Sequence, residues 1–255
     1  MNVYFFYAGE ETLLPRQTAI QTLAGLLASD CRPHLLGDLC RLAISGVETL
    51  EKISRDREGR IISEYQPRAV GVLFAYAGLE GPDPEKIISH SGMCSCGVLS
   101  AVFGREAHPS GEDLKEAGKQ LDSLERDNRS GWRPWYPVID RERCKSCGQC
   151  AGFCLFEVYE VPEDGRIAVK NPGKCKDNCP ACARICPEGA IIFPKFPAPP
   201  VNGGEGESSE PVRIDPSIFT DGDIMGKLRQ RAGKIPADLV EKFRKECDCS
   251  EKTEK

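Results

Sequence analysis

The sequence predicts a multidomain protein that combines an α/β domain with a mostly parallel sheet, a smaller α+β repeat and a short helical tail. Three observations support this fold class. Strand and helix patterns alternate in residues 1–131, residues 132–197 contain an internal repeat, and residues 198–216 are rich in Pro, Gly, Ser and Glu. Strands that alternate with helices are typical of a parallel sheet covered by helices. A chain of 255 residues has room for about one or two domains.

The first elements follow from local patterns. An apolar, aromatic run at residues 2–8 predicts a strand. The helix that follows is predicted from a stripe of apolar side chains, Ile20, Leu23, Leu26 and Leu27. Asp38 is placed to cap a second helix, whose apolar residues are Leu39, Leu42, Ala43, Val47 and Leu50.

The rest of the N-terminal domain continues the alternation. Residues 61–65 and, more weakly, residues 86–90 predict strands. Pro67 suits the first turn of a helix that Gly78 ends, with an apolar stripe of Val70, Leu73, Phe74 and Ala77. Residues 113–128 predict a polar helix.

The C-terminal part is expected to begin with a stretch that buries little surface. Residues 198–216 have the composition of a flexible linker. Two short helices are predicted within residues 217–255, and Pro236 suits the start of the second. Their apolar faces either pack on the body of the protein, which we favour slightly, or bind a partner protein. Cys247 and Cys249 lie in the polar tail and are expected to be incidental.

Charge and hydropathy exclude several classes of function. The net charge is −5 and no block of basic residues occurs, which disfavours a nucleic-acid partner. No apolar run approaches the length of a membrane span. The first 17 residues lack the basic start of a signal peptide. We therefore expect a cytoplasmic protein, in which clustered cysteines bind metal or do redox chemistry more often than they form disulfides.

Eight of the 14 cysteines form two similar runs. The first is Cys144-x2-Cys147-x2-Cys150-x3-Cys154, and the second is Cys175-x3-Cys179-x2-Cys182-x3-Cys186. Each run lies between two short β patterns, so the segment consists of two halves that we expect to be related by an approximate two-fold axis.

The spacing favours iron–sulfur chemistry. A cubane cluster needs four thiolates around it, and three closely spaced cysteines on one loop can bind three of its irons while a fourth ligand comes from elsewhere. Zinc sites with four cysteines use two pairs without an interleaved third cysteine, so zinc is the weaker interpretation. A disulfide framework is weaker still in a cytoplasmic protein.

At these residues the chain resembles the two-[4Fe-4S] bacterial-type ferredoxin domain, over about residues 137–194. The resemblance implies low-potential, one-electron transfer and a fourth ligand that crosses between the halves. One cluster would then be held by Cys144, Cys147, Cys150 and Cys186, and the other by Cys175, Cys179, Cys182 and Cys154. The chain departs from the pattern at Leu155, where proline is usual, and in the extra residue between Cys175 and Cys179.

Four further cysteines precede these runs. Cys31, Cys40, Cys94 and Cys96 are most simply interpreted as buried, small hydrophobic residues. The Cys-Ser-Cys sequence at residues 94–96 could instead hold a metal or form a strained disulfide.

The loops after the predicted parallel strands are expected to meet at one edge of the sheet, where open α/β sheets bind ligands. Polar and reactive side chains would then converge there: Tyr7, Glu10, Glu64, Tyr65, His90, Cys94 and Cys96. Neither a Gly-x-Gly-x-x-Gly turn after the first strand nor a phosphate-binding loop is present, so nothing indicates a common nucleotide site.

Together these patterns predict an iron–sulfur electron-transfer protein that carries two [4Fe-4S] clusters and exchanges single electrons with redox partner proteins. No catalytic residue is needed for that role. The alternative is an enzyme or enzyme subunit whose N-terminal domain holds a further redox site, namely a flavin, a metal or the thiols of Cys94 and Cys96. A third possibility is a scaffold in which the clusters are purely structural.

Overall fold

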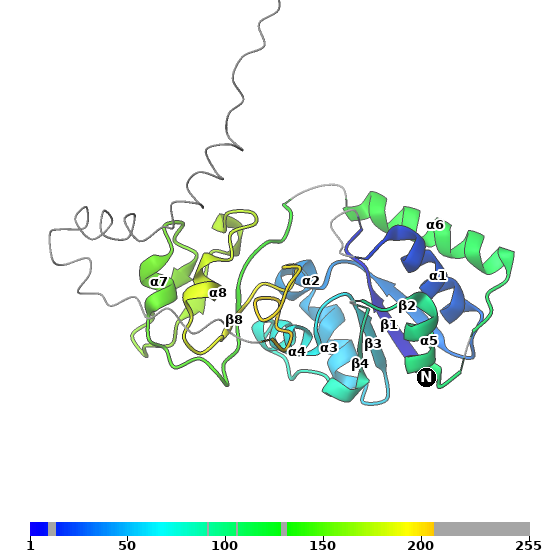
Figure 1. Ribbon diagram of the computed structural model, residues 1–255, viewed down its shortest axis with the longest axis horizontal. Coiled ribbons are helices and arrows are strands. Elements are labelled where there is room, and N and C mark those ends of the chain that lie inside the picture. The colour runs from blue at the N-terminus through cyan, green and yellow to red at the C-terminus, as the bar shows by residue number, and fades with distance from the viewer. Residues whose placement is uncertain (10–13, 91, 106, 129–131, 207–255) are drawn as a thin grey trace, which may run out of the picture. The chain divides into compact units, whose positions relative to one another are not determined.

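A computed structural model describes residues 1–9, 14–90, 92–105, 107–128 and 132–206 (Figure 1). The chain divides into a compact unit, Met1–Val212, and a second unit, Arg213–Lys255. The predicted tail helices, the end of the predicted linker and the cysteines at 247 and 249 lie outside the described residues.

A four-stranded parallel sheet forms the N-terminal part, as the alternation of elements predicts. Its strands are β1 (Asn2–Phe6), β2 (Arg32–Leu36), β3 (Arg60–Ser63) and β4 (Ile87–Ser89), in the order β2-β1-β3-β4. The register pairs Val3 of β1 with Pro33 on one side and with Arg60 on the other. The chain adds β2 on one side of β1 and then adds β3 and β4 on the other side. The switch point of the sheet therefore lies between β1 and β3, and such sheets bind ligands at the carboxyl ends of the strands there.

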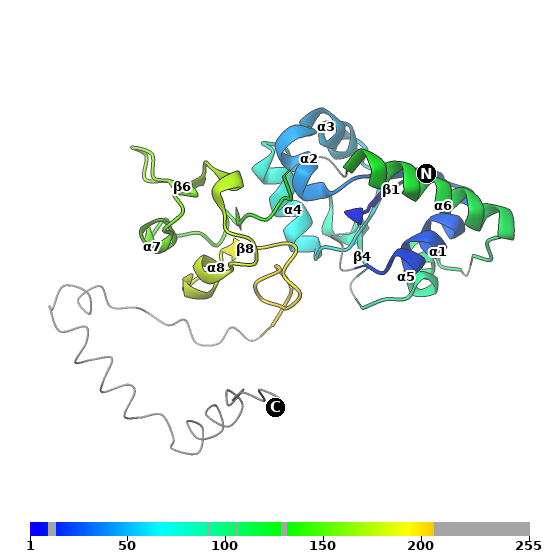
Figure 2. The same cartoon turned by 90° about the horizontal axis from the view of Figure 1, so that it is seen from above.

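Helices cover both faces of this sheet (Figure 2). One face carries α2 (Leu39–Ser45), α3 (Val47–Arg55) and α4 (Pro67–Tyr76), and the other carries α1 (Arg16–Leu27), α5 (Ser95–Phe103) and α6 (Gly111–Asn128). A 3₁₀ turn, η2 (Pro84–Lys86), precedes β4. Adjacent strand residues point to opposite faces, so Phe5 packs against α1, α5 and α6, whereas Phe6 packs against α2, α3 and α4. Burial on both faces explains the continuous apolar run of β1.

Local sequence signals account for several helix ends. The Asp38 side chain accepts a hydrogen bond from the Cys40 N–H at the start of α2, and Pro67 occupies the first turn of α4, as predicted. Gly78 adopts a left-handed φ of 78° just after α4. The single helix predicted across residues 39–50 is wrong, because the chain breaks at Gly46 into α2 and α3.

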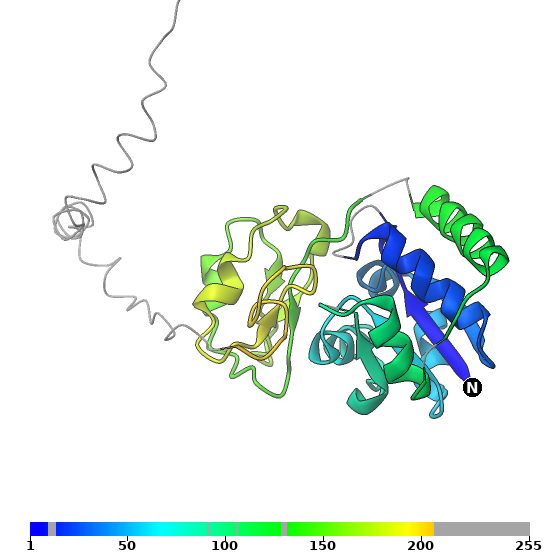
Figure 3. The ribbon, with the colours of Figure 1, turned by 45° about the vertical axis from the view of Figure 1, so that its right-hand side comes forward.

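The cysteine-rich repeat forms a small unit of short elements (Figure 3). Its first half contains β5 (Val138–Ile139), α7 (Gln149–Phe153) and β6 (Tyr159–Glu160). Its second half contains β7 (Ala168–Val169), η3 (Pro172–Lys174), α8 (Ala181–Ile185) and β8 (Ile191–Ile192). Strand β5 pairs antiparallel with β8, and β6 pairs antiparallel with β7. The two halves are therefore joined by matching pairs, as expected for an approximate two-fold relation.

Left-handed backbone positions recur at matching places in the two halves. Ser146 and Asn178 each precede the second cysteine of their run, and their φ angles are 52° and 57°. Glu157 and Gly189 each follow the fourth cysteine by three residues, with φ angles of 53° and 56°. Such conformations are uncommon outside glycine, so their repetition shows that both cysteine loops follow one backbone path. The extra residue of the second loop is absorbed before Asn178, where the Cys179 N–H bonds the Lys176 carbonyl.

The repeat shares a hydrophobic core with the sheet domain. Tyr136, Val138 and Ile192 belong to the same buried cluster as Ala69 and Val70 of α4. Val138 and Ile192 are fully buried, and burying side chains of this size contributes about 1.5–3 kcal/mol each. The two parts therefore share one core, and the predicted domain boundary near residue 131 stays a prediction.

The start of the predicted linker is packed rather than flexible. Val201 and Asn202 are buried, and the Val201 carbonyl accepts a hydrogen bond from the Phe193 N–H at 2.8 Å. Gly203 has a φ of 87°, and a Cβ atom there would lie 3.3 Å from Ala69 and Ile192. The expectation of little buried surface is wrong for residues 201–203, because Gly203 allows a close approach to α4 and β8.

Candidate metal centre

Four of the eight clustered cysteines line a single pocket in the repeat. Cys144, Cys147 and Cys150 come from the first run, and Cys186 comes from the second. Apolar side chains of Ile139, Ile167 and Ile191 line the same pocket. The structure thus brings together the first predicted ligand set, including its member from the opposite half.

The other four cysteines interact with one another in the same crossed pattern. Burial, together with the neighbouring sulfurs of Cys182, Cys179 and Cys154, raises the pKa of Cys175 to about 12. Burial also raises the pKa of Cys182 to about 11, with Cys154 and Cys179 as further contributors. Cys154 of the first run therefore lies among the thiols of the second run. A bound metal would reverse this trend, because coordination deprotonates a thiol.

All eight thiols are free cysteines, so the donor set is complete for soft metal centres. Within the ranges that the structure describes, no group of three or more Cys, His, Asp or Glu side chains is close enough to hold a single metal ion. The four thiols of the first set line one pocket together.

Backbone N–H groups point at two of these sulfurs. The Ala190 N–H donates to Cys186 Sγ at 3.3 Å, and the Ser146 N–H donates to Cys144 Sγ at 3.4 Å. Hydrogen bonds of this kind help to set the reduction potential of an iron–sulfur centre.

Sequence reasoning missed Arg68, which reaches this site from α4. Its Nη2 donates to the Gly189 carbonyl at 2.9 Å, and its Nε donates to Asp140 Oδ2 at 2.7 Å. Gly189 and Ala190 share one peptide group, so Arg68 holds the peptide whose N–H bonds Cys186. No local signal marks Arg68, because its partners are more than 70 residues away in the sequence.

The carboxyl edge of the sheet holds a second site, a pocket of about 270 Å³. Glu64, His90 and Cys94 all line it, so part of the predicted convergence is confirmed. His90 is 2% exposed, and its Nε2 lies 2.8 Å from Thr22 Oγ1. Burial lowers the pKa of His90, which the backbone of His90 and Met93 partly opposes. The neutral imidazole is therefore favoured.

Neither predicted tyrosine lines this pocket, and the predicted convergence is wrong for Tyr65. The Tyr65 hydroxyl points to the opposite face of the sheet, where it donates to Asp38 at 2.9 Å. The Tyr7 hydroxyl donates to Glu125 of α6 at 3.1 Å. Successive residues after a strand point to opposite faces, which separates Tyr65 from Glu64. The glutamate at position 10 lies outside the described residues.

The remaining cysteines differ in environment. Cys94 and Cys96 are exposed and form a disulfide, so interpreting them as buried hydrophobic residues is wrong. Cys40 is buried in the core, as that interpretation expects, and Cys31 is half-buried. Burial raises the pKa of both Cys31 and Cys40.

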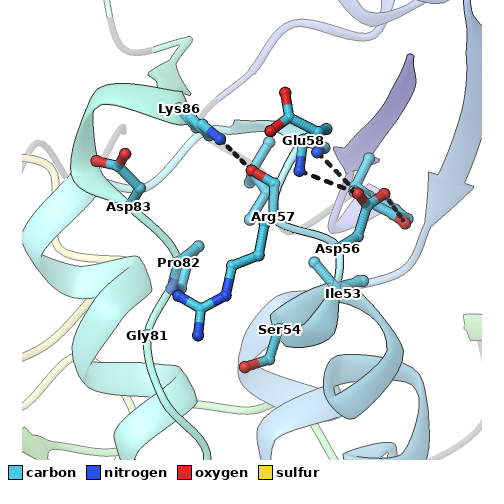
Figure 4. A pocket seen from close by; sticks show the side chains of 12 residues that line it. Ile53, Ser54, Asp56, Arg57, Glu58, Gly81, Pro82, Asp83 and Lys86 are labelled. Atoms are coloured by element: carbon cyan, nitrogen blue, oxygen red, sulfur yellow. Dashed lines mark hydrogen bonds between the residues drawn. The ribbon is translucent and has the colours of Figure 1, made fainter.

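A further pocket, of about 160 Å³, lies at the opposite edge of the sheet (Figure 4). Asp56 accepts hydrogen bonds there from Tyr4, Asn2 and the N–H groups of Glu58 and Gly59. These bonds close the turn before β3, and the Asn2 bond is the largest cause of the lowered pKa of Asp56. The pocket precedes β3 and β4, away from the edge where parallel sheets bind ligands, so we assign it a structural role.

Comparison with known proteins identifies the cysteine-rich repeat. It is 34% identical over 56 residues to a ferredoxin of Methanothermococcus thermolithotrophicus, a match that spans 90% of that protein and 21% of this chain. The chain belongs to the ferredoxin family. The ferredoxin segment is also 34% identical over 65 residues to the pyruvate synthase subunit PorD of Methanocaldococcus jannaschii, covering 73% of that subunit and 25% of this chain.

The ferredoxin segment also matches a longer relative. It is 51% identical over 61 residues to an uncharacterized ferredoxin of M. jannaschii, covering 24% of this chain. The chain spans 41% of the length of that relative. No family model matches the chain. Among the helices that the structure describes, none is long and apolar enough to cross a membrane.

Proposed function

We propose that this protein transfers single electrons through two [4Fe-4S] clusters held by its ferredoxin segment. The observation that carries the proposal is the crossed grouping of the eight thiols. Cys186 lines a pocket with three cysteines of the other run, and Cys154 interacts with Cys175 and Cys182 of the second run. The left-handed residues at matching places in the two cysteine loops favour two similar sites rather than one larger site.

Each site would be completed by residues of both halves. Cys144, Cys147, Cys150 and Cys186 would hold one cluster, and Cys175, Cys179, Cys182 and Cys154 would hold the other. Bound clusters would supply one-electron oxidation and reduction. The chain contributes thiolates in fixed positions, N–H donors to sulfur, and an isoleucine lining that keeps water from the first site.

A redox protein is the partner that we propose. One matched relative is named as a subunit of pyruvate synthase, so it works in an assembly with other chains. Exposed apolar side chains surround Cys154, and Leu155 is 89% exposed. These residues place apolar surface next to a proposed cluster ligand, where an electron would leave or enter. Contact through the C-terminal tail stays a prediction.

The composition of the purified protein tests this proposal. The full chain, purified without oxygen, is expected to contain about eight irons and eight acid-labile sulfides. Reduction should yield two interacting paramagnetic centres by electron paramagnetic resonance. Zinc without sulfide would overturn the proposal and leave a zinc-bound scaffold. Full iron and sulfide content with no reduction by low-potential donors would favour a purely structural role.

The alternative function places a further redox site in the sheet domain. The observation that favours it is the Cys94–Cys96 disulfide beside the pocket at the carboxyl edge. Flavin in the purified protein, or about twelve irons per chain, would support a cofactor-bearing version of this alternative.

We expect Arg68→Met to lower the potential of the cluster that contains Cys186. The substitution frees the Gly189–Ala190 peptide and removes a positive charge, and both changes disfavour the more negative reduced form. A shift of tens of millivolts is expected, since a tenfold change in a one-electron equilibrium is about 59 mV. Redox titration monitored by electron paramagnetic resonance measures it.

Two comparisons make the Arg68 result specific. Arg68→Lys keeps the charge but loses the planar fork that bonds Gly189 and Asp140, so it separates the two causes. The cluster of the second run serves as an internal reference, because no described contact joins it to Arg68. Equal shifts of both clusters would contradict a role through the Cys186 hydrogen bond.

A further inference from the structure

We propose that Cys94 and Cys96 form a redox-active dithiol–disulfide site that reacts with small thiols in the pocket at the carboxyl edge of the sheet. This site deepens the alternative function above, and its chemistry does not depend on the clusters of the ferredoxin segment. Cys94 lines this pocket, and the disulfide joins it to Cys96 in the first turn of α5, the helix that follows β4 at the ligand-binding edge.

The disulfide has the exposure of a reactive bond. Both cysteines are exposed, their Cα atoms are 5.4 Å apart, and only Ser95 separates them. Exposed disulfides are the ones that reducing thiols attack, whereas structural disulfides resist them. The surrounding core does not need this link, because α5 already buries Val98, Leu99 and Val102 against the sheet domain.

The beginning of α5 distinguishes the two sulfurs. Cys94 is the N-cap residue, and its Sγ accepts a hydrogen bond from the Gly97 N–H at 3.3 Å. A helix N-terminus stabilises a thiolate, so Cys94 is the better leaving group. An incoming thiolate is therefore expected to attack Cys96 Sγ.

The exchange balances with thiols as the reductant. One thiolate attacks Cys96 Sγ, the bond between the two cysteines breaks, and Cys94 leaves as a thiolate. A second thiolate attacks the outer sulfur of the mixed disulfide, so a small-molecule disulfide forms and Cys96 leaves as a thiolate, which takes up a proton. In sum, two small thiols are oxidised to one disulfide, and the protein disulfide is reduced to two thiols.

The adjoining pocket offers polar groups for a small ligand. Its volume of about 270 Å³ is just below the roughly 300–1,000 Å³ typical of small-molecule sites, which suits a small thiol. Thr18, Gln21 and Glu64 line it together with His90.

Redox equilibration with glutathione tests the site on the full chain. The protein is incubated with mixtures of reduced and oxidised glutathione, quenched with acid, alkylated and digested with trypsin. The tryptic peptide 87–105 contains these two cysteines and no others, so mass spectrometry reports them separately from the cluster ligands. We expect at least about tenfold more dithiol in reduced than in oxidised glutathione, reversibly.

Single variants test the assignment of the two sulfurs. Cys96→Ser leaves Cys94, and Cys94→Ser leaves Cys96. We expect Cys94 to be alkylated about tenfold faster than Cys96 at neutral pH, because a helix N-terminus stabilises the reactive thiolate. Ser100→Ala, on the exposed side of α5, should leave the glutathione equilibrium within about twofold of the unmodified protein.

Two outcomes overturn the proposal. A disulfide that stays oxidised in reduced glutathione and yields only to excess dithiothreitol is structural. Thiols that stay reduced in oxidised glutathione do not form the couple at all. Neither result depends on the iron and sulfide content, which tests the electron-transfer proposal. A failure of this site can therefore be distinguished from a failure of that proposal.

Discussion

Cys186→Ala should remove the cluster of the first cysteine run, although Cys186 belongs to the second run. The reason is the crossed arrangement, in which Cys186 lines the pocket of Cys144, Cys147 and Cys150. A cubane that loses one of four thiolates loses much of its binding energy, and the folding of the segment is coupled to that binding. Iron and sulfide should each fall from about eight to about four per chain.

Double variants decide which cysteines share a cluster. If Cys186 and Cys144 hold the same cluster, Cys186→Ala with Cys144→Ala should retain as much iron as Cys186→Ala alone. Cys186→Ala with Cys175→Ala should instead lose both clusters. This non-additivity is the signature of residues that act as one unit. The reverse pattern would contradict the crossed pairing.

Cys31→Ala is the matched control for these variants. Cys31 is half-buried at the end of α1, and its Sγ bonds the Leu26 carbonyl at 3.3 Å. It lies in neither cysteine run, so its removal should leave iron and sulfide unchanged. A loss of iron comparable to that of Cys186→Ala would show that the assay reports general destabilisation.

Lys195→Met is expected to destabilise the protein by about 3–5 kcal/mol. Lys195 Nζ lies 2.6 Å from Asp38 Oδ2, and their side chains are only 10% and 4% exposed. Removing the ammonium leaves Asp38 as a buried charge without its counter-ion, which costs more than the pair contributes. The bond joins the end of the ferredoxin segment to the cap of α2, so the loss should be global.

Tryptophan fluorescence in a urea titration without oxygen measures this loss. Both tryptophans of the chain lie near the ion pair, since Trp135 stacks on Phe193 and Trp132 stacks on Tyr136. Arg57→Met is the control, because Arg57 pairs with Glu80 on the surface and its loss should cost under about 1 kcal/mol. Similar costs for the two variants would contradict a special role of the buried pair.

A double variant separates the charge from the packing. Lys195→Met with Asp38→Asn removes both charges while an amide oxygen remains to accept the bonds from Cys40 and Tyr65. We expect it to be more stable than Lys195→Met alone, because no buried charge is left unpaired.

The sequence predicts those parts of the fold that local patterns encode. β1, β3, β4 and the start of α4 follow from apolar runs and from Pro67. β2 escapes prediction because it contains Pro33, which a strand tolerates at a sheet edge where its missing N–H faces no partner. Helix α5 escapes because its first residues are glycine, serine and cysteine, which favour loops.

The candidate site also contains residues that the sequence predicts and residues that it does not. The cysteine spacing predicts the two runs of ligands, and the crossed thiol sets follow from the resemblance to a ferredoxin domain that these runs carry. Arg68, Asp38 and Lys195 could not be predicted, because each acts through partners that are distant in the sequence. The failed convergence of Tyr65 has a simple cause: one residue along the chain reverses the direction of a side chain.

The shared core of Tyr136, Val138, Ile192 and α4 restricts how this chain can be rearranged. A ferredoxin segment cut out between residues 132 and 197 would expose apolar surface, and it would lose both Lys195's counter-ion and the Val201 contact. The two parts are therefore not interchangeable modules. A transplant of the redox segment into another protein has to bring α4 with it, or replace that surface with a newly designed one.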